Sequence, residues 1–543
     1  MFPNLNASLV IWLLFGVAMI YVLLVPGRRG RKLPHGPSTL PIIGNLHQLP
    51  QSQLYLTFAN LAKRYGEMYS LKIGSMTFIV LSSRKLVKEV LERKSVISSG
   101  RMYSYALEKL IFQEHFMTIQ QSDNPMLRVG RKLLHQYFGD SAIDKGHLEI
   151  LNAEATQLLR DLMIDPENFR HHFHRYGNSF AMSKTYGIRT PRHDTPHLKA
   201  LNYITAETAA IILPGALPPV DVFPILKIVP QKWFGNWRTR CIELGKASDK
   251  LNSWILNTVI ERRKTEGPKD TFADKLIEYD EYKFTFHEMM YLTATVLDAG
   301  TDTTASVLLV LVQMLCTYPD VLKRAHTEID AVVGEDRTPL WTDFPKLQII
   351  NQLMKEAHRI RPVTPIAMPH KLSEEIWIEG KLLPKGAIIV PNLFGLHQDV
   401  EKFADPEVFN PDNFSSKTKL AQGYANIGDE NNRDHYSYGF GRRICSGMQL
   451  AERSLFTTFS KMLWAFDISP ELDSQGRPIP IDLNPNTGYT DGSIVAPKPF
   501  KARFKVRSER RRQTILREFA DVEEKVFSRF AVPDLTMSFE KTA

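Results

Sequence analysis

The feature that most constrains the fold is a long apolar segment, free of proline, between residues 285 and 318. Thr285 and Glu288 form an S/T-x-x-E capping pattern at its start, and Pro319 marks its end. A helix of about 32 residues is roughly 48 Å long, enough to cross a whole domain. Because the segment is apolar on nearly every side, we expect the helix to be buried. The rest of the chain must then pack around it.

The sequence AGTDTT, Ala299 to Thr304, interrupts this apolar segment at its centre. Gly300 alone costs about 1 kcal/mol of helix stability, and Asp302 would be buried with the helix. Two interpretations remain open. Either the small residues let a large group pack against the backbone while hydroxyl and carboxyl groups carry protons, or the threonines bond back to the preceding turn and kink the helix.

The remaining pattern indicates a mainly α fold with small β-sheets. Apolar alternation that turns at Gly74 and Ser75, before changing to helical spacing, predicts a β-hairpin followed by a helix. Residues 127–334 have mostly helical spacing, with a proline-rich break at 213–224. Short strands are expected after Pro362, where the chain becomes rich in proline and glycine.

An uncharged apolar run near the N-terminus, Ser8 to Val25, is long enough for one membrane-spanning helix. The basic residues that follow it directly favour a cytoplasmic location for the rest of the chain. They are Arg28, Arg29, Arg31 and Lys32. A cleaved signal peptide is the alternative, but the run lacks basic residues before it and a small-residue cleavage site after it. We therefore expect a retained single-pass anchor.

These features divide the chain into four parts. The anchor is residues 8–25, and residues 26–50 form a basic, proline-rich hinge that we expect to be extended and stiff. Residues 51–506 form the main body. Residues 507–543 form a charged C-terminal extension with weak helical spacing, to which the sequence assigns no role.

Only three cysteines occur in 543 residues, and one of them, Cys445, lies in the sequence YSYGFGRRICSG. Their odd number and wide spacing argue against a disulfide framework and for a reducing compartment. A buried inert cysteine is the usual alternative, and a nucleophile would need a close dyad partner. A metal ligand suits Cys445 better, because Gly439, Gly441 and Gly447 let backbone amides approach the sulfur. Arg443 can neutralise an acidic group of a cofactor.

This loop resembles the haem-binding loop F-x-x-G-x-R-x-C-x-G of the cytochrome P-450 family, with Tyr438 in place of the phenylalanine. AGTDTT is similar to the oxygen-activation motif of that family, and Glu356 with Arg359 matches its E-x-x-R motif. Further similarities are a Pro-His pair ending at His370 and the sequence DPEVFNPDNF beginning at Asp405. The resemblance covers nearly the whole main body and implies the cytochrome P-450 fold, preceded by one N-terminal transmembrane helix.

The resemblance implies a role for each matching residue. Cys445 would be the axial thiolate ligand of the iron of heme b. Thr303 and Asp302 would deliver protons to dioxygen, and Gly300 would open the helix for it. The E-x-x-R pair would brace the fold beneath the haem. The expected partners of the haem propionates are Arg131, His370 and Arg443. The other expected cofactor-binding positions are Tyr438, Gly441 and Gly447.

Two positions depart from the family pattern. Leu127 replaces the tryptophan of W-R-x-x-R, so one donor to a propionate is missing. Asn413 replaces an arginine that joins the E-x-x-R pair, and its amide can hydrogen-bond Glu356 but carries no charge. We expect somewhat looser haem retention and preserved activity.

The resemblance implies a membrane-anchored monooxygenase that inserts one atom of O2 into a lipophilic small molecule. Its electrons would come from NADPH through a separate NADPH–cytochrome P-450 reductase, whose acidic surface would dock on a basic face that includes Arg442. The net charge of +9 is compatible with such a partner or with a merely solubilising surface. The expected location is the endoplasmic reticulum membrane, single-pass, with the catalytic domain facing the cytoplasm. Nucleic acid is not an expected partner.

The sequence around Cys445 is most similar to filamentous-fungal members of the family, which favours secondary-metabolite biosynthesis. A catabolic aromatic hydroxylase is the main alternative. A haem-thiolate isomerase or dehydratase and a non-catalytic haem-binding sensor are further alternatives, which the intact Thr303 and Asp302 disfavour. The expected substrate-pocket walls are residues 112–119, 206–213, Ala299, 363–367 and Tyr489.

Overall fold

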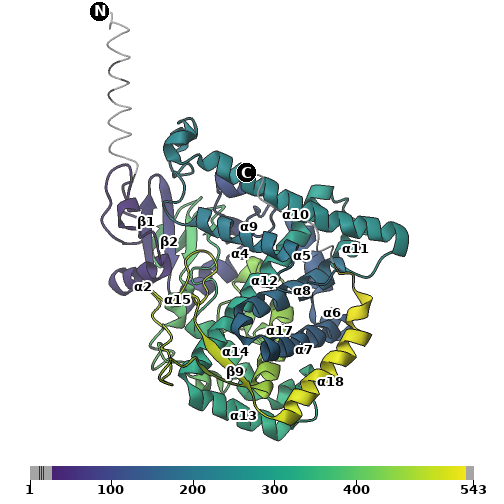
Figure 1. Cartoon of the computed structure of the whole chain (residues 1–543). Coiled ribbons are helices and arrows are strands. Elements are labelled where there is room, and N and C mark those ends of the chain that lie inside the picture. The colour runs from purple at the N-terminus through teal and green to yellow at the C-terminus, as the bar shows by residue number, and fades with distance from the viewer. Residues whose placement is uncertain (1–11, 13, 15, 17–26, 533–543) are drawn as a thin grey trace, which may run out of the picture.

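The computed structural model describes residues 27–532 together with Trp12, Leu14 and Gly16. The predicted anchor, residues 8–25, lies almost entirely outside the described residues, and so does the end of the C-terminal extension. The fold is mainly helical with small sheets, as predicted (Figure 1).

The predicted long helix is α12, Phe286–Thr317, at the centre of the molecule. Both bonds of the predicted capping box form: Thr285 accepts from the backbone of Glu288, whose side chain accepts from the backbone of Thr285. Among the described residues, α12 is the one helix long and apolar enough to span a membrane. However, 78% of its most apolar stretch is buried inside the protein, as in the core helix of a globular domain.

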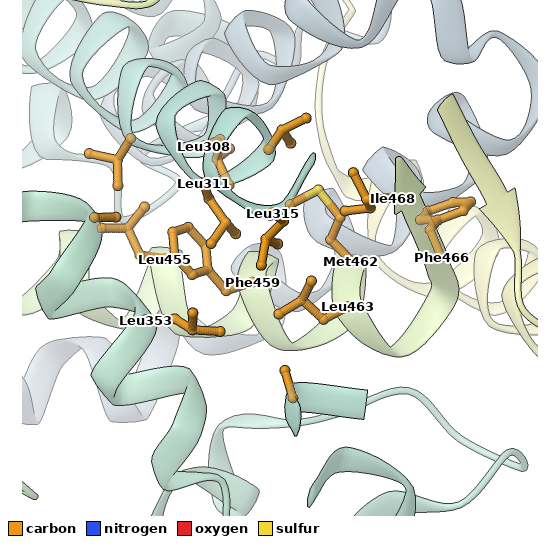
Figure 2. Packing of buried hydrophobic residues seen from close by; sticks show 14 of the residues in the cluster. Leu308, Leu311, Leu315, Leu353, Leu455, Phe459, Met462, Leu463, Phe466 and Ile468 are labelled. Atoms are coloured by element: carbon orange, nitrogen blue, oxygen red, sulfur yellow. The ribbon is translucent and has the colours of Figure 1, made fainter. Parts of the chain in front are cut away.

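The main core forms where α12 meets the helices beside it. These neighbours are α7 (Leu148–Ile164), α8 (Phe169–Tyr186), α13 (Pro319–Val333), α14 (Gln348–Ile360) and α17 (Met448–Ala465). Figure 2 shows leucines of α12 packing against aliphatic and aromatic side chains of α17, with Leu353 of α14 below them. Burial of each such side chain contributes about 1.5–3 kcal/mol to folding. The core therefore fixes the position of α12 relative to the cysteine loop that precedes α17.

Further helices surround this core. They are α2 (Leu54–Tyr65), α3 (Arg84–Val87), α4 (Ser95–Ser98), α5 (Pro125–Tyr137), α6 (Asp140–Gly146), α9 (Pro196–Ile212), α10 (Trp237–Glu266), α11 (Phe272–Ile277), α15 (Leu393–His397), α16 (Gln422–Ala425) and α18 (Glu509–Lys525). The predicted break at 213–224 falls between α9 and α10. Two π-helical segments, η2 (Lys88–Arg93) and η3 (Tyr105–Ile111), follow the first hairpin.

The largest sheet has five strands in the order β1-β2-β7-β4-β3. Its strands are β1 (Met68–Ile73), β2 (Met76–Leu81), β3 (Gly100–Arg101), β4 (His370–Lys371) and β7 (Ile388–Pro391). The β1–β2 hairpin is the predicted one, and β2 pairs with β7 in parallel. Antiparallel pairing of β3 with β4 places Arg101 opposite His370. Two small antiparallel sheets of two strands each are β5 (Ile376–Ile378) with β6 (Lys381–Leu383), and β8 (Phe466–Pro470) with β9 (Ala502–Val506).

The described part of the proline-rich hinge is attached to β1. Arg29 Nε donates to Ser70 Oγ at 2.8 Å, and its Nη2 donates to the carbonyl oxygen of Ser70 at 2.9 Å. Gly44 pairs with Ile73 through an isolated bridge. The segment therefore follows the sheet instead of crossing open solvent.

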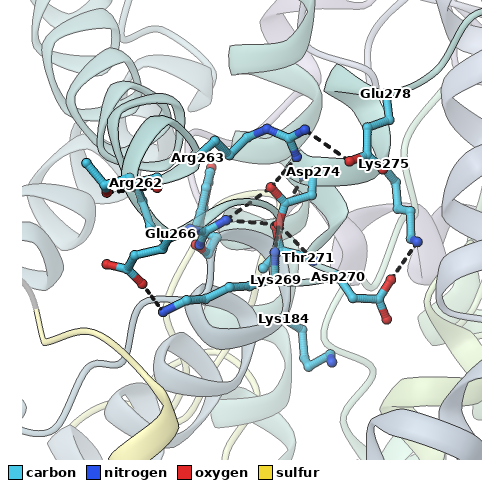
Figure 3. Close-up of polar contacts among 12 residues, drawn as sticks. Lys184, Arg262, Arg263, Glu266, Lys269, Asp270, Thr271, Asp274, Lys275 and Glu278 are labelled. Atoms are coloured by element: carbon cyan, nitrogen blue, oxygen red, sulfur yellow. Dashed lines mark hydrogen bonds and ion pairs between the residues drawn. The ribbon is translucent and has the colours of Figure 1, made fainter.

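A charged cluster joins α10 to α11 (Figure 3). Asp274 accepts from Arg262 at 2.9 Å and from Arg263 at 2.6 Å, and it completes a capping box with Thr271. Burial alone would raise the pKa of Asp274, but the hydrogen bonds from Thr271 and Arg263 lower it to about 2. The carboxylate therefore stays charged and holds the end of α10 against α11.

The C-terminal extension contains a helix, α18, that packs against α7 and runs across the outside of the body (Figure 1). Arg507 and Arg511 both pair with Asp330, at 2.6 and 2.7 Å. Glu518 accepts from the backbone and the hydroxyl of Thr338, at 2.8 and 2.6 Å. Residues 507–518 are thus bound to the body by several polar contacts, which the weak helical spacing did not predict.

Candidate active site

A cavity of about 360 Å³ lies between α12, the cysteine loop and the start of α17. We call it the central cavity. Its lining is mostly apolar, and no carboxylate among the described residues lines it. The residues of α12 that line it are Thr295, Val296, Ala299, Gly300, Thr303, Thr304 and Val307. The cysteine loop contributes residues 437–440 and 443–447, whereas Gly441 and Arg442 do not line the cavity.

The cysteine loop is shaped by its glycines. Gly439 and Gly441 have φ of 78° and 47°, in the left-handed region that favours glycine. A Cβ on Gly441 would lie 2.2 Å from the carbonyl oxygen of Leu91, so Gly441 lets the loop pack against η2. The amide of Cys445 donates to the carbonyl oxygen of Tyr438 at 2.8 Å, which closes the loop.

Cys445 is exposed, and its exposed surface faces the central cavity. Burial within the protein raises the pKa of its thiol, and the amide of Gly447 and the charge of Arg131 oppose this effect. A thiolate is therefore disfavoured here until a cation binds it. Cys241 and Cys316 lie in the core, where burial raises their thiol pKa to about 11 and 12. Neither lines the cavity.

Three arginines line the central cavity, and among the described residues none of them forms an ion pair. Arg131 on α5 donates to the carbonyl oxygen of Ile444 at 2.6 Å. Arg443 donates to the carbonyl oxygens of Ser99 and Gln120, at 2.9 and 2.5 Å. Sequence reasoning indicated both of these arginines.

Arg101 is the third arginine, and sequence reasoning missed it. It is buried and donates to the carbonyl oxygens of Thr118 and Met368, at 3.1 and 3.0 Å. Burial, followed by repulsion from Arg443 and Arg131, lowers its pKa to about 9. A two-residue strand carries no periodicity that a sequence pattern detects, so only pairing with β4 brings Arg101 to the site. The uncompensated positive charge indicates an anionic ligand.

His370 also lines the cavity, but its Nδ1 lies 2.7 Å from the carbonyl oxygen of Ser98. Burial, then the charge of Arg101, lowers its pKa to about 3. The neutral ring therefore uses its N–H on Ser98 and presents Nε2 as an acceptor. In this geometry His370 has no second N–H for a carboxylate, and the three arginines supply the donors.

Adjacent residues of the AGTDTT sequence face different sides of α12. Thr303 lines the central cavity, and its hydroxyl donates to the carbonyl oxygen of Ala299 at 2.6 Å. Asp302 does not line the cavity: its Oδ1 lies 3.1 Å from Nδ1 of His174 on α8. Asp302 is thus partly buried, as expected, with an imidazole partner that the sequence did not reveal.

Gly300 lies where α8 and α12 pack closely. A Cβ there would lie 3.2 Å from the Cβ of Ala181. The helix α12 is continuous from Phe286 to Thr317, and the expected opening at Gly300 stays a prediction. The hydroxyl of Thr301 bonds back to the carbonyl oxygen of Leu297 at 2.7 Å, as the second interpretation of the threonines predicted.

The E-x-x-R pair, on α14, is fully buried. Arg359 Nε and Nη2 donate to both oxygens of Glu356, at 2.7 and 2.6 Å. Asn413 Nδ2 lies 3.3 and 3.4 Å from the same oxygens, as the sequence predicted. Leu127, which replaces the family's tryptophan, is buried among apolar neighbours.

The expected pocket walls are confirmed only in part. Met117, Thr118 and Ala299 line the cavity, together with Val363, Thr364 and Ala367. Residues 206–213 do not line it, and neither does Tyr489, whose hydroxyl donates to Oε1 of Gln313 at 2.6 Å. Arg442 is exposed at the surface, as a docking residue must be.

A sequence model of the family described as cytochrome P450 matches residues 34–503. The chain belongs to the cytochrome P450 family. Its relatives include the cytochrome P450 monooxygenase macC of Penicillium terrestre, 42% identical over 93% of this chain and 95% of the relative. The monooxygenase yanC of Aspergillus niger is 42% identical over the same shares, and patH of Penicillium expansum is 41% identical over 96% of this chain and 98% of the relative. The protein is therefore a haem-thiolate monooxygenase, an oxidoreductase.

Cytochromes P450 hold a haem through a cysteine thiolate and use O2 with electrons from a redox partner. The central cavity fits that group. Cys445 opens into it, and the lining is mostly apolar. Arg101, Arg131 and Arg443 form no ion pair among the described residues, so their charges suit the carboxylates of a cofactor. A Cβ on Gly447 would meet no atom within 4 Å, so the cavity side of the loop is open. These residues thus fit a largely apolar, acidic cofactor whose metal the sulfur of Cys445 would hold.

Proposed function

We propose that this cytochrome P450 inserts one oxygen atom from O2 into a lipophilic small molecule in fungal secondary metabolism. The observation that carries the proposal is that Cys445 and Thr303 line the same apolar cavity. When bound, heme b would supply the iron at which oxygen is activated. The names of the fungal relatives support the reaction class but name no substrate.

Each site residue has a proposed task. Cys445 would hold the iron, and the amide of Gly447 would stabilise its thiolate charge. Arg101, Arg131 and Arg443 would bind the carboxylates of the cofactor. Tyr438 and Gly441 hold the shape of the cysteine loop, and His370 forms part of the wall. Thr303 holds a proton at the cavity face of α12.

Electrons would come from NADPH through a separate reductase. The exposed Arg442 lies three residues before Cys445, where an acidic domain would dock close to the cysteine loop. We propose that residues 8–25 anchor the chain in the endoplasmic reticulum membrane, residues 26–50 orient residues 51–506, and residues 507–543 support the body. Because surface charges are screened by salt, reductase-supported turnover is expected to fall steeply as salt is added.

Deletion of the gene in its host, followed by accurate-mass comparison of metabolites, tests the proposal. A lipophilic precursor is expected to accumulate that is one oxygen lighter than the product that disappears. The purified protein, supplied with that precursor, reductase, NADPH and ¹⁸O2, is then expected to add one ¹⁸O atom.

Two other outcomes would contradict the proposal. Product formation from an organic peroxide without NADPH would indicate an isomerase or dehydratase. An unchanged metabolite profile together with lost growth on an aromatic carbon source would indicate a catabolic hydroxylase.

A further inference from the structure

One imidazole connects the solvent side of α8 to the oxygen-activation motif of α12. His174 Nδ1 lies 3.1 Å from Oδ1 of Asp302, and the two side chains are 24% and 15% exposed. Asp302 faces α8, whereas its neighbour Thr303 faces the central cavity. The pair therefore lies between the partly hydrated α8 side and the residue that meets the reaction site.

Backbone packing fixes this arrangement. A Cβ on Gly177, one turn after His174, would lie 2.8 Å from the carbonyl oxygens of both Gly300 and Thr301. Asn178 also donates to the hydroxyl of Thr301 at 3.3 Å. Since α8 and α12 meet backbone to backbone here, the two helices hold the backbones of His174 and Asp302 at a fixed separation.

A second carboxyl group lies on the same face of α12. Asp298 precedes Asp302 by four residues, so the two side chains are neighbours on the helix surface. Burial, and then the charge of Asp302, raises the pKa of Asp298 to about 7. A carboxyl group that keeps its proton up to about neutral pH therefore lies one turn from Asp302 on the same helix.

We propose that His174 carries protons from solvent to Asp302 and thus supplies the Asp302–Thr303 pair during turnover. This inference rests on the proposed monooxygenase function. Doubly protonated His174 gives its Nδ1 proton to the Asp302 carboxylate, and the neutral ring then takes a proton from a solvent acid. Asp302 gains one proton, the solvent loses one, and His174 returns to its starting charge. Imidazole suits this task because it both accepts and donates near neutral pH.

Replacement of His174 by asparagine tests the proposal. In His174→Asn the amide still donates to Asp302 but cannot exchange protons, so a merely structural role is preserved. The probe substrate is the precursor that accumulates in the deletion strain. We expect product formed per NADPH to fall about 10-fold or more, with a matching rise in peroxide, and a larger solvent isotope effect.

The matched control is His171→Asn, the same change on the same helix one turn away, at an exposed position without a bond to Asp302. It is expected to behave as the wild type. His174→Gln, which has the same chemistry in a longer side chain, replaces His174→Asn if that variant loses haem or helix content.

Ring-nitrogen NMR of protein labelled with ¹⁵N-histidine gives a readout independent of activity. We expect the His174 signals, assigned by their loss in His174→Asn, to show a protonated Nδ1 that shifts in Asp302→Asn. The relay would be overturned if His174→Asn formed as much product per NADPH as His171→Asn. It would also be overturned if the His174 signals were unchanged in Asp302→Asn. Failure of the wild type to oxygenate the precursor would instead overturn the proposed function.

Discussion

At the scale of single residues, the orientation of neighbouring side chains separates their tasks. Thr303 points into the central cavity and Asp302 points to α8, although they are adjacent in sequence. The hydroxyl of Thr303 donates a hydrogen bond to the carbonyl oxygen of Ala299 in its own helix. Thr303 is therefore available to the site without being needed for packing.

Thr303→Ala is expected to uncouple the enzyme. Stability should change by no more than about 1 kcal/mol, because one intrahelical hydrogen bond is lost. NADPH consumption should persist while product formed per NADPH falls about 10-fold or more. The two rates are measured together with peroxide release.

Thr301→Ala is the matched control for this prediction. Thr301 makes the same bond to its own helix but faces Asn178 of α8 and not the cavity. It is expected to retain normal coupling. Equal uncoupling in both variants would mean that loss of helix packing, and not loss of a cavity hydroxyl, causes the effect.

The sequence motifs predicted much of the site at this scale. Thr303, Arg131 and the pair Arg443 and Cys445 come from three separate segments, and the structure brings them to one cavity. Arg101 could not be predicted, because it reaches the cavity only through tertiary pairing of two very short strands. The partner of Asp302 was hidden for a similar reason: helix–helix packing, and not sequence spacing, brings α8 beside α12.

At the scale of elements, α14 is held to the loops beneath the haem site by one buried carboxylate. Glu356 receives two bonds from Arg359, one from the backbone of Asn410 at 2.7 Å and longer ones from Asn413. Arg359 also donates to the carbonyl oxygens of Pro406 and Val408. The pair therefore organises the chain on the way to the cysteine loop.

Glu356→Gln is expected to lower the free energy of unfolding by about 3–5 kcal/mol, because it leaves the buried charge of Arg359 without a counter-charge. Asn413→Ala should cost only about 1 kcal/mol, since it removes long, neutral-donor bonds. Urea unfolding followed by circular dichroism measures both. An equal loss of stability in Asn413→Ala and Glu356→Gln would contradict this, because it would mean that Asn413 is as important as Glu356 for the contacts around Arg359.

Elements with strong local signals were the ones predicted well. The capping box and Pro319 gave both ends of α12, and alternation gave the β1–β2 hairpin. The packing of α18 on the body was not predicted, because the helical spacing of its apolar residues is weak. Its contacts include ion pairs such as that of Arg510 with Asp336, at 2.7 Å. Such contacts depend on distant segments that sequence periodicity does not relate.

At the scale of the whole molecule, α18 of the C-terminal extension contacts a buried side chain of the core helix α17. Lys461 of α17 is fully buried, and the carboxylate of Glu518 on α18 lies 3.8 Å away. Lys461 also contacts the hydroxyls of Thr156 and Thr338. Burial lowers the pKa of Lys461 to about 8 from its usual 10.5, although Glu518 opposes the shift.

Glu518→Gln is expected to destabilise the protein by about 1–3 kcal/mol at pH 7 and by less at pH 9.5. The folded-state pKa lies below the unfolded value, so between about 8 and 10.5 the folded chain binds fewer protons and stability from this group rises with pH. Loss of Glu518 lowers the pKa of Lys461 in the folded protein further. The resulting loss of stability is largest at a pH where Lys461 would otherwise be charged. Thermal unfolding at the two pH values measures the difference; an equal loss at both would contradict the role assigned to Glu518.

The central claim is that Cys445 is the thiolate ligand of a haem in the central cavity. The most direct test is the carbon monoxide difference spectrum of the reduced, purified protein, compared between the wild type, Cys445→Ser and the control Cys241→Ala. We predict the strongly red-shifted band of thiolate-ligated haem in the wild type and in Cys241→Ala, and its complete loss in Cys445→Ser. A wild-type protein without that band, or a Cys445→Ser variant that keeps it, would contradict the account.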